Sequence, residues 1–183
     1  MIAILLALAC AKHPETPMNV LTQPPEIAPS PAFIPVEPTQ SKLSNGATLW
    51  HVHRPGLPLV SLELVLPGGG TTDPSGAPGT VSIADAMVLE GAGSRDATAF
   101  SAEADRLAVE ISVETWGVAS IISLDAHTDR FEAGLDLFAD AVRRPVFGQS
   151  DLDRVKKESL ADLKESMDDP RAISGIVMDA AYY

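Results

Sequence analysis

The alternation of apolar and polar residues predicts strands and helices from residue 48 to the end of the chain. Residues 58–66 place Val60, Leu62 and Leu64 on one side, and residues 109–115 alternate with period two, as strands do. The expected strands cover residues 48–53, 58–66, 109–115 and 118–124. The expected helices cover about 79–91, 98–107, 128–143, 151–168 and 170–183. This order predicts an α+β fold with two layers, in which helices cover an antiparallel sheet.

Residues 68–93 (GGGTTDPSGAPGTVSIADAMVLEGAG) form the stretch around which the other elements are arranged. A strand ends in a glycine cluster, a loop rich in proline and glycine follows, and a helix then runs towards Gly91. Apolar residues surround much of this helix, which therefore fits a buried helix packed on a sheet. No Lys-Ser or Lys-Thr pair follows the glycines, so a phosphate-binding loop is not expected.

One face of this helix carries Ser82, Asp85 and Ala86, at positions i, i+3 and i+4. Two imidazoles at i and i+4 could hold one zinc ion, and a carboxylate at i+3 could serve as general base to its water. Here the same positions offer a hydroxyl, a short carboxylate and a methyl group. Serine is a poor zinc ligand and alanine is none, so no metal is expected on this face.

The order of elements after residue 43 resembles the N-terminal half of an insulinase-like (M16) zinc metallopeptidase domain. The local matches are Asn45-Gly46, the glycine loop, Arg144-Pro145-Val146-Phe147 and Asp168-Asp169-Pro170. The resemblance implies the M16/LuxS-like metallohydrolase fold, incomplete at its C-terminus. It also places the family's H-x-x-E-H motif on Ser82-Ile83-Ala84-Asp85-Ala86, and the third, glutamate zinc ligand on Asp162.

By that resemblance, the chain is expected to have no catalytic or metal-binding residues of its own and no zinc cofactor. The implied function is a non-catalytic subunit that completes a peptide-binding chamber with a zinc-bearing M16 subunit or a second M16 domain. One alternative is a stand-alone envelope lipoprotein with a structural or binding role. The other is an active zinc metalloendopeptidase with ligands outside the expected helix; His51 and His53 share a strand face, but no acidic or cysteine partner is identifiable.

The charge of the chain excludes one class of partner. Its formal net charge is −12, and a nucleic-acid-binding surface needs lysine and arginine to neutralise phosphates. Nucleic acid is therefore not an expected partner. An acidic, solvated surface is the plain explanation of the charge.

The N-terminal residues predict export and a lipid anchor. The apolar run MIAILLALA is too short to span a bilayer and reads as a signal-peptide core. Ala7-Leu8-Ala9-Cys10 resembles a bacterial lipobox, which makes Cys10 the expected lipidation site. The following Ala11 favours the periplasmic face of the outer membrane.

The composition divides the chain into three parts. Residues 1–10 are the expected lipoprotein signal peptide. Residues 11–40 contain eight prolines and few large apolar residues, which predicts an extended tether. Residues 41–183 are the expected peptidase-like domain.

Overall fold

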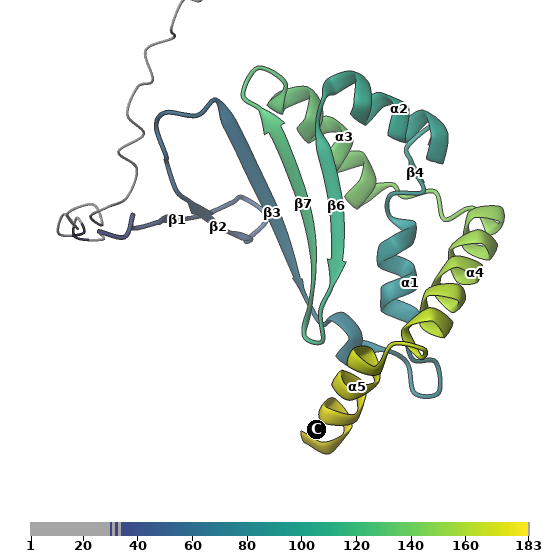
Figure 1. Cartoon of the computed structure of the whole chain (residues 1–183). Helices are drawn as coiled ribbons and strands as arrows, with labels where there is room; N and C mark the ends of the chain where they lie inside the picture. The colour runs from purple at the N-terminus through teal and green to yellow at the C-terminus, as the bar shows by residue number, and fades with distance from the viewer. Residues whose placement is uncertain (1–29, 31, 33, 183) are drawn as a thin grey trace, which may run out of the picture. The chain divides into compact units, whose positions relative to one another are not determined.

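The fold was analysed in a computed structural model that describes residues 30, 32 and 34–182. The chain divides into two units, one ending at His53 and one spanning Arg54–Tyr183 (Figure 1). Cys10 and most of the predicted tether lie outside the described residues.

The first unit contains an antiparallel hairpin of β1 (Thr39–Lys42) and β2 (Thr48–His51). A turn that contains Asn45-Gly46 lies between them, where the Leu43 N–H donates to the Ala47 carbonyl at 2.8 Å. The Ala47 N–H in turn donates to the Asn45 side chain at 3.1 Å. The second strand ends at His51, two residues earlier than the sequence predicts, and β1 is a strand that the sequence pattern does not reveal.

The second unit is built on a three-stranded antiparallel sheet with the order β3-β7-β6. Its strands are β3 (Leu59–Pro67), β6 (Glu110–Thr115) and β7 (Ala119–His127). The register pairs Leu62 with Leu124 and Ile122 with Val113, so the apolar positions of all three strands share one face. The opposite face is largely polar, and there Ser61 donates a hydrogen bond to Asp125.

Helices cover the apolar face of this sheet (Figure 1). Packed on β6 and β7 are α1 (Thr80–Met87), α2 (Ala97–Leu107) and α3 (Phe131–Arg143). Short elements join them: η1 (Gly69–Thr72), β4 (Gly91–Ala92) and β5 (Arg95–Asp96). The core consists of Ala92, Phe100, Leu107, Val109, Ile122, Leu124, Ala126, Leu137, Phe138 and Ala141. An antiparallel sheet with helices on one face confirms the predicted α+β, two-layer class.

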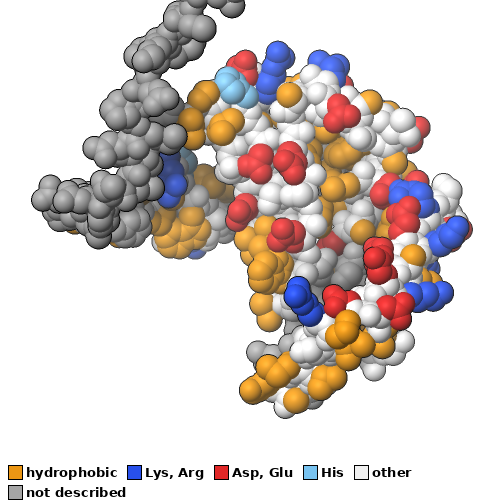
Figure 2. Space-filling view, in the orientation of Figure 1, with side chains coloured by type: hydrophobic (Ala, Val, Ile, Leu, Met, Phe, Trp, Pro, Cys, Tyr) orange, Lys and Arg blue, Asp and Glu red, His pale blue; other side chains and the backbone are white. Residues whose placement is uncertain are grey.

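Two further helices follow, α4 (Gln149–Ser166) and α5 (Pro170–Tyr182). The first half of α4 packs against α1 and buries Val155. The sequence pattern places Leu163 and Met167 on the same apolar stripe, but both are more than half exposed. Exposed apolar side chains continue along α5, in the lower part of Figure 2.

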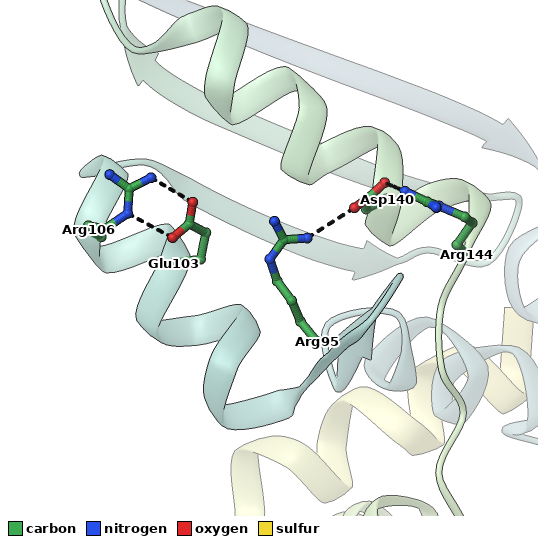
Figure 3. Close-up of polar contacts among 5 residues, drawn as sticks. All are labelled: Arg95, Glu103, Arg106, Asp140 and Arg144. Carbon is green, nitrogen blue, oxygen red and sulfur yellow. Dashed lines mark hydrogen bonds and ion pairs between the residues drawn. The ribbon is translucent and has the colours of Figure 1, made fainter.

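A charged cluster fixes the connection between β5 and the end of α3. Asp140 on α3 accepts a hydrogen bond from Arg95 at 3.1 Å and another from Arg144 (Figure 3). The Arg144 guanidinium, reinforced by Arg95, holds the pKa of the Asp140 carboxyl below its usual value. The Gly93 N–H also donates to the Arg144 carbonyl at 2.8 Å, so the strand and helix end are tied by backbone and side chain together.

None of the helices in the described part of the chain is both long and apolar enough to cross a lipid bilayer.

Candidate functional site

The glycine loop before α1 is held against the hairpin turn between β6 and β7. The Gly70 N–H donates to the Trp116 carbonyl at 3.0 Å, and the Thr71 N–H donates to Gly117 at 2.8 Å. Gly69 has a φ of +51°, and a Cβ there would lie 2.1 Å from the Trp116 oxygen. Only glycine allows this approach, and the approach determines where the loop leaves the sheet.

The loop leads into α1, and a side chain within the loop caps the start of that helix. The Asp73 carboxylate accepts hydrogen bonds from Gly79 N–H at 2.6 Å and Val81 N–H at 2.8 Å. These N–H groups have no partner within the helix, and a carboxylate also complements the positive end of the helix dipole. Asp73 thus sets the start of the helix that carries the degenerate motif.

That helix lies where the motif helix is predicted, against β6 of the antiparallel sheet and against α4. Ser82 and Ala86 on it are exposed, whereas Asp85 is half-buried. The Oδ2 atom of Asp85 accepts hydrogen bonds from Thr115 Oγ1 at 2.7 Å and from Ser120 Oγ at 2.5 Å. The carboxylate therefore joins α1 to the facing ends of β6 and β7.

Asp162, which the resemblance places at the position of the third ligand, is exposed on α4. Within residues 34–182, no three histidine, cysteine, aspartate or glutamate side chains are grouped so that they could hold a metal ion. The donor set at the motif positions does not fit zinc. A hydroxyl and a methyl group replace the two imidazoles, and the only carboxylate between them is already held by two hydroxyl donors.

The three histidines among the described residues lie away from the motif positions. The rings of His51 and His53 have centroids 6.5 Å apart, and both residues are exposed. His127 at the end of β7 contacts Asp129 at 2.5 Å between Nδ1 and Oδ1. That hydrogen bond lowers the pKa of the Asp129 carboxyl, which is exposed.

Sequence reasoning did not single out Thr115 and Ser120 as partners of Asp85. A signal for Ser120 is nevertheless present, because it has the same strand parity as the buried Ile122 and Leu124. A serine on the buried face of a strand needs a hydrogen-bond partner. The partner's identity depends on α1 crossing the strand ends, which the linear pattern does not specify.

Comparison with solved structures supports this architecture. The chain is similar to the crystal structure of a peptidase M16 inactive domain from Pseudomonas fluorescens, with 25% sequence identity and a TM-score of 0.73. This match covers 78% of the chain and 35% of that protein. The crystal structure of pitrilysin has the same fold, with 21% identity, a TM-score of 0.61, and coverage of 72% of this chain and 14% of pitrilysin.

The chain therefore spans about a third of the first of these proteins and about a seventh of the second. No curated protein sequence is significantly similar to it. The model of the family described as insulinase (peptidase family M16) matches residues 51–182, which is well over half of the sequence. The chain belongs to peptidase family M16, the insulinase family.

Proposed function

We propose that this chain is a non-catalytic M16 subunit that completes a peptide-binding chamber with a zinc-bearing partner at the cell envelope. The observation that carries the proposal is the motif helix itself. Its loop, its cap and its place against the sheet are retained, while Ser82 and Ala86 stand where zinc ligands would be needed.

The surroundings of Asp85 support a structural role for the position where the family's general base is expected. A general base needs a free lone pair directed at the water that it activates. Asp85 Oδ2 instead receives two hydroxyl hydrogen bonds, and Ser120, one of the donors, is 5% exposed. These hydrogen bonds join α1 to the ends of β6 and β7, which supports a structural role for the carboxylate.

The similarity to a domain described as inactive supports the same proposal. A scaffold without metal ligands can still contribute shape and peptide-binding surface to an assembly with an active subunit. The predicted lipidation of Cys10 would anchor the assembly to the membrane, with the proline-rich segment as its tether. The partner, the peptide ligand and the location all belong to the proposal.

Affinity capture tests the partnership. The full chain carrying a C-terminal tag is expressed in its native host, and the detergent-solubilised envelope fraction is captured. We expect a protein with an H-x-x-E-H motif to be recovered, and we expect the isolated pair to cleave peptides faster than that protein alone. Recovery of the chain by itself would favour the alternative of a stand-alone envelope lipoprotein. A Cys10→Ser variant is the matched control for anchoring and is expected to move to the soluble fraction.

Metal analysis tests the absence of catalysis by the chain itself. After dialysis the purified chain is expected to contain far less than one zinc ion per molecule. The Ser82→His/Ala86→His variant, with two imidazoles one helical turn apart, is expected to retain more zinc and validates the measurement. Stoichiometric, tightly held zinc in the unmodified chain would contradict the proposal and favour an active metalloendopeptidase.

A further inference from the structure

A cavity of about 420 Å³ lies between α1 and the beginning of α4. From α1 it is lined by Thr80, Ile83, Ala84 and Met87, whose spacing of three and four residues places them on one helix face. Ser82, Asp85 and Ala86 do not line it, and neither does Asp162. The cavity is thus separate from the degenerate motif.

The walls of the cavity are mostly apolar and contain one cationic side chain. Pro78, Phe147 and Leu152 complete the apolar lining, and Lys156 on α4 supplies the positive charge. No carboxylate of the described residues lies within 4.0 Å of the Lys156 ammonium. Lys156 is exposed, so its charge is available to a ligand at the mouth of the cavity.

Two parts of the cavity wall, Met87 and Phe147, are held in place by the fold. Met87 is only 1% exposed, and it gives the cavity a fixed floor. Phe147 has a φ of +49°, a backbone conformation that few residues other than glycine adopt. The chain on both sides of it is held by hydrogen bonds, from the Val146 N–H to Gly91 at 3.0 Å and from the Leu152 N–H to Gly148 at 2.9 Å. The aromatic side chain is therefore carried by a backbone that is fixed on both sides.

We infer that this cavity binds a small amphiphile with an apolar body and a single carboxylate, which pairs with Lys156. The volume lies towards the lower end of the range of about 300–1,000 Å³ that is usual for small-molecule sites. A carboxylate is favoured because Lys156 is the only charged residue of the lining, and its charge acts locally against the repulsion from the chain's net charge of −12. Two sources share this chemistry: a free monocarboxylic acid and the apolar C-terminal residue of a peptide.

The experiment follows the methionine methyl groups of the full chain by nuclear magnetic resonance. The probes are phenylbutyrate, the dipeptide N-acetyl-alanyl-phenylalanine, and the same dipeptide with an amidated C-terminus. We expect saturable shifts of the Met87 methyl resonance with the carboxylates and none at Met167, which is exposed at the C-terminal end of α4. The carboxylate that binds more tightly shows whether the ligand is a free monocarboxylic acid or the C-terminal residue of a peptide. Equal binding of the amide, or no shift at Met87 with either carboxylate, would overturn the inference.

Variants of two neighbouring lysines separate the cavity from general charge effects. Lys156→Gln is expected to weaken carboxylate binding about two- to fivefold, the range for a solvent-exposed ion pair. Lys157→Gln removes the same charge from the next residue, which does not line the cavity, and is expected to leave binding unchanged. Ala84→Phe fills the cavity from the exposed side of α1 and is expected to abolish binding. Equal effects of the two lysine variants would refute the assignment.

Discussion

At the residue scale, Asp85 shows how a catalytic framework can keep a carboxylate in a structural role. Its Oδ2 atom is bound by Thr115 and Ser120, which lie 30 and 35 residues away in the chain. The sequence predicts that zinc ligands are missing, because the resemblance places Ser82 and Ala86 at their positions. It does not reveal these two donors, since long-range hydrogen bonds depend on how α1 crosses the sheet.

Substitution of Asp85 tests this structural role. Asp85→Ala is expected to lower the free energy of unfolding by about 1–3 kcal/mol, because it leaves the buried Ser120 hydroxyl without its acceptor. Asp162→Ala, at an exposed position, is expected to change it by less than about 0.5 kcal/mol. Denaturant unfolding measures both. Equal stability of the two variants would show that the Asp85 hydrogen bonds contribute nothing.

Gly69 gives a second test at the same scale. Gly69→Ala is expected to lower the free energy of unfolding by roughly 2–3 kcal/mol, since its Cβ would collide with the Trp116 oxygen at a positive φ. Gly70→Ala is the matched control, because the nearest atom to its Cβ is 4.0 Å away. Thermal unfolding compares the two. A glycine loop that tolerates both substitutions equally would not be held against the hairpin as described.

At the scale of elements, the sequence predicts regular periods well and short or polar segments poorly. The strand pairs and α3 follow from their apolar spacing, as the core positions Ile122, Leu124 and Phe138 confirm. β1 is fully exposed and polar, and β4 and β5 have two residues each. None of these three strands therefore has an alternation of apolar and polar residues that could be detected. The sequence pattern places Val155, Leu163 and Met167 on one apolar stripe, yet Val155 is buried and the other two are more than half exposed.

The Asp140 cluster predicts a pH dependence at this scale. The carboxyl's pKa is lowered in the folded state, so its stabilisation is present above the unfolded value of about 3.9 and is lost as the pH falls through the folded value. Asp140→Asn is expected to reduce the free energy of unfolding by about 1 kcal/mol at neutral pH. The difference from the wild type should shrink as the pH falls below about 3.9. Unfolding curves at a series of pH values measure it.

Asp136→Asn is the control for that series. Asp136 is exposed one turn earlier on α3, and the described residues give it no ion pair. Its substitution is expected to leave the unfolding curves nearly unchanged at every pH. A similar loss in both variants would assign the effect to the overall charge of the protein and not to Arg95 and Arg144.

At the scale of the whole molecule, the acidic surface and the exposed apolar helices have opposite effects on self-association. The net charge of −12 opposes association, whereas Leu163, Met167 and Val177 are each more than half exposed on α4 and α5. Family membership and fold class could be inferred from the order of elements. The exposure of these helices could not, because an amphipathic pattern does not say which surface covers it.

Self-association of the purified chain tests this balance. Raised salt is expected to increase association, since it screens the acidic repulsion and leaves the apolar contacts intact. Val177→Glu is expected to reduce it, while Leu57→Glu, at an exposed loop position before β3, serves as the control. Sedimentation velocity at several concentrations measures both. Unchanged association in Val177→Glu would show that α5 takes no part.

The helix cap formed by Asp73 indicates where residues can be inserted into the protein. The Asp73 carboxylate accepts hydrogen bonds directly from Gly79 and Val81. Residues 74–78, between Asp73 and Gly79, therefore form a loop with both ends fixed. Additional residues inserted there would bulge outwards without displacing the helix that follows. The loop is therefore a natural place to graft an epitope or a fluorescent label.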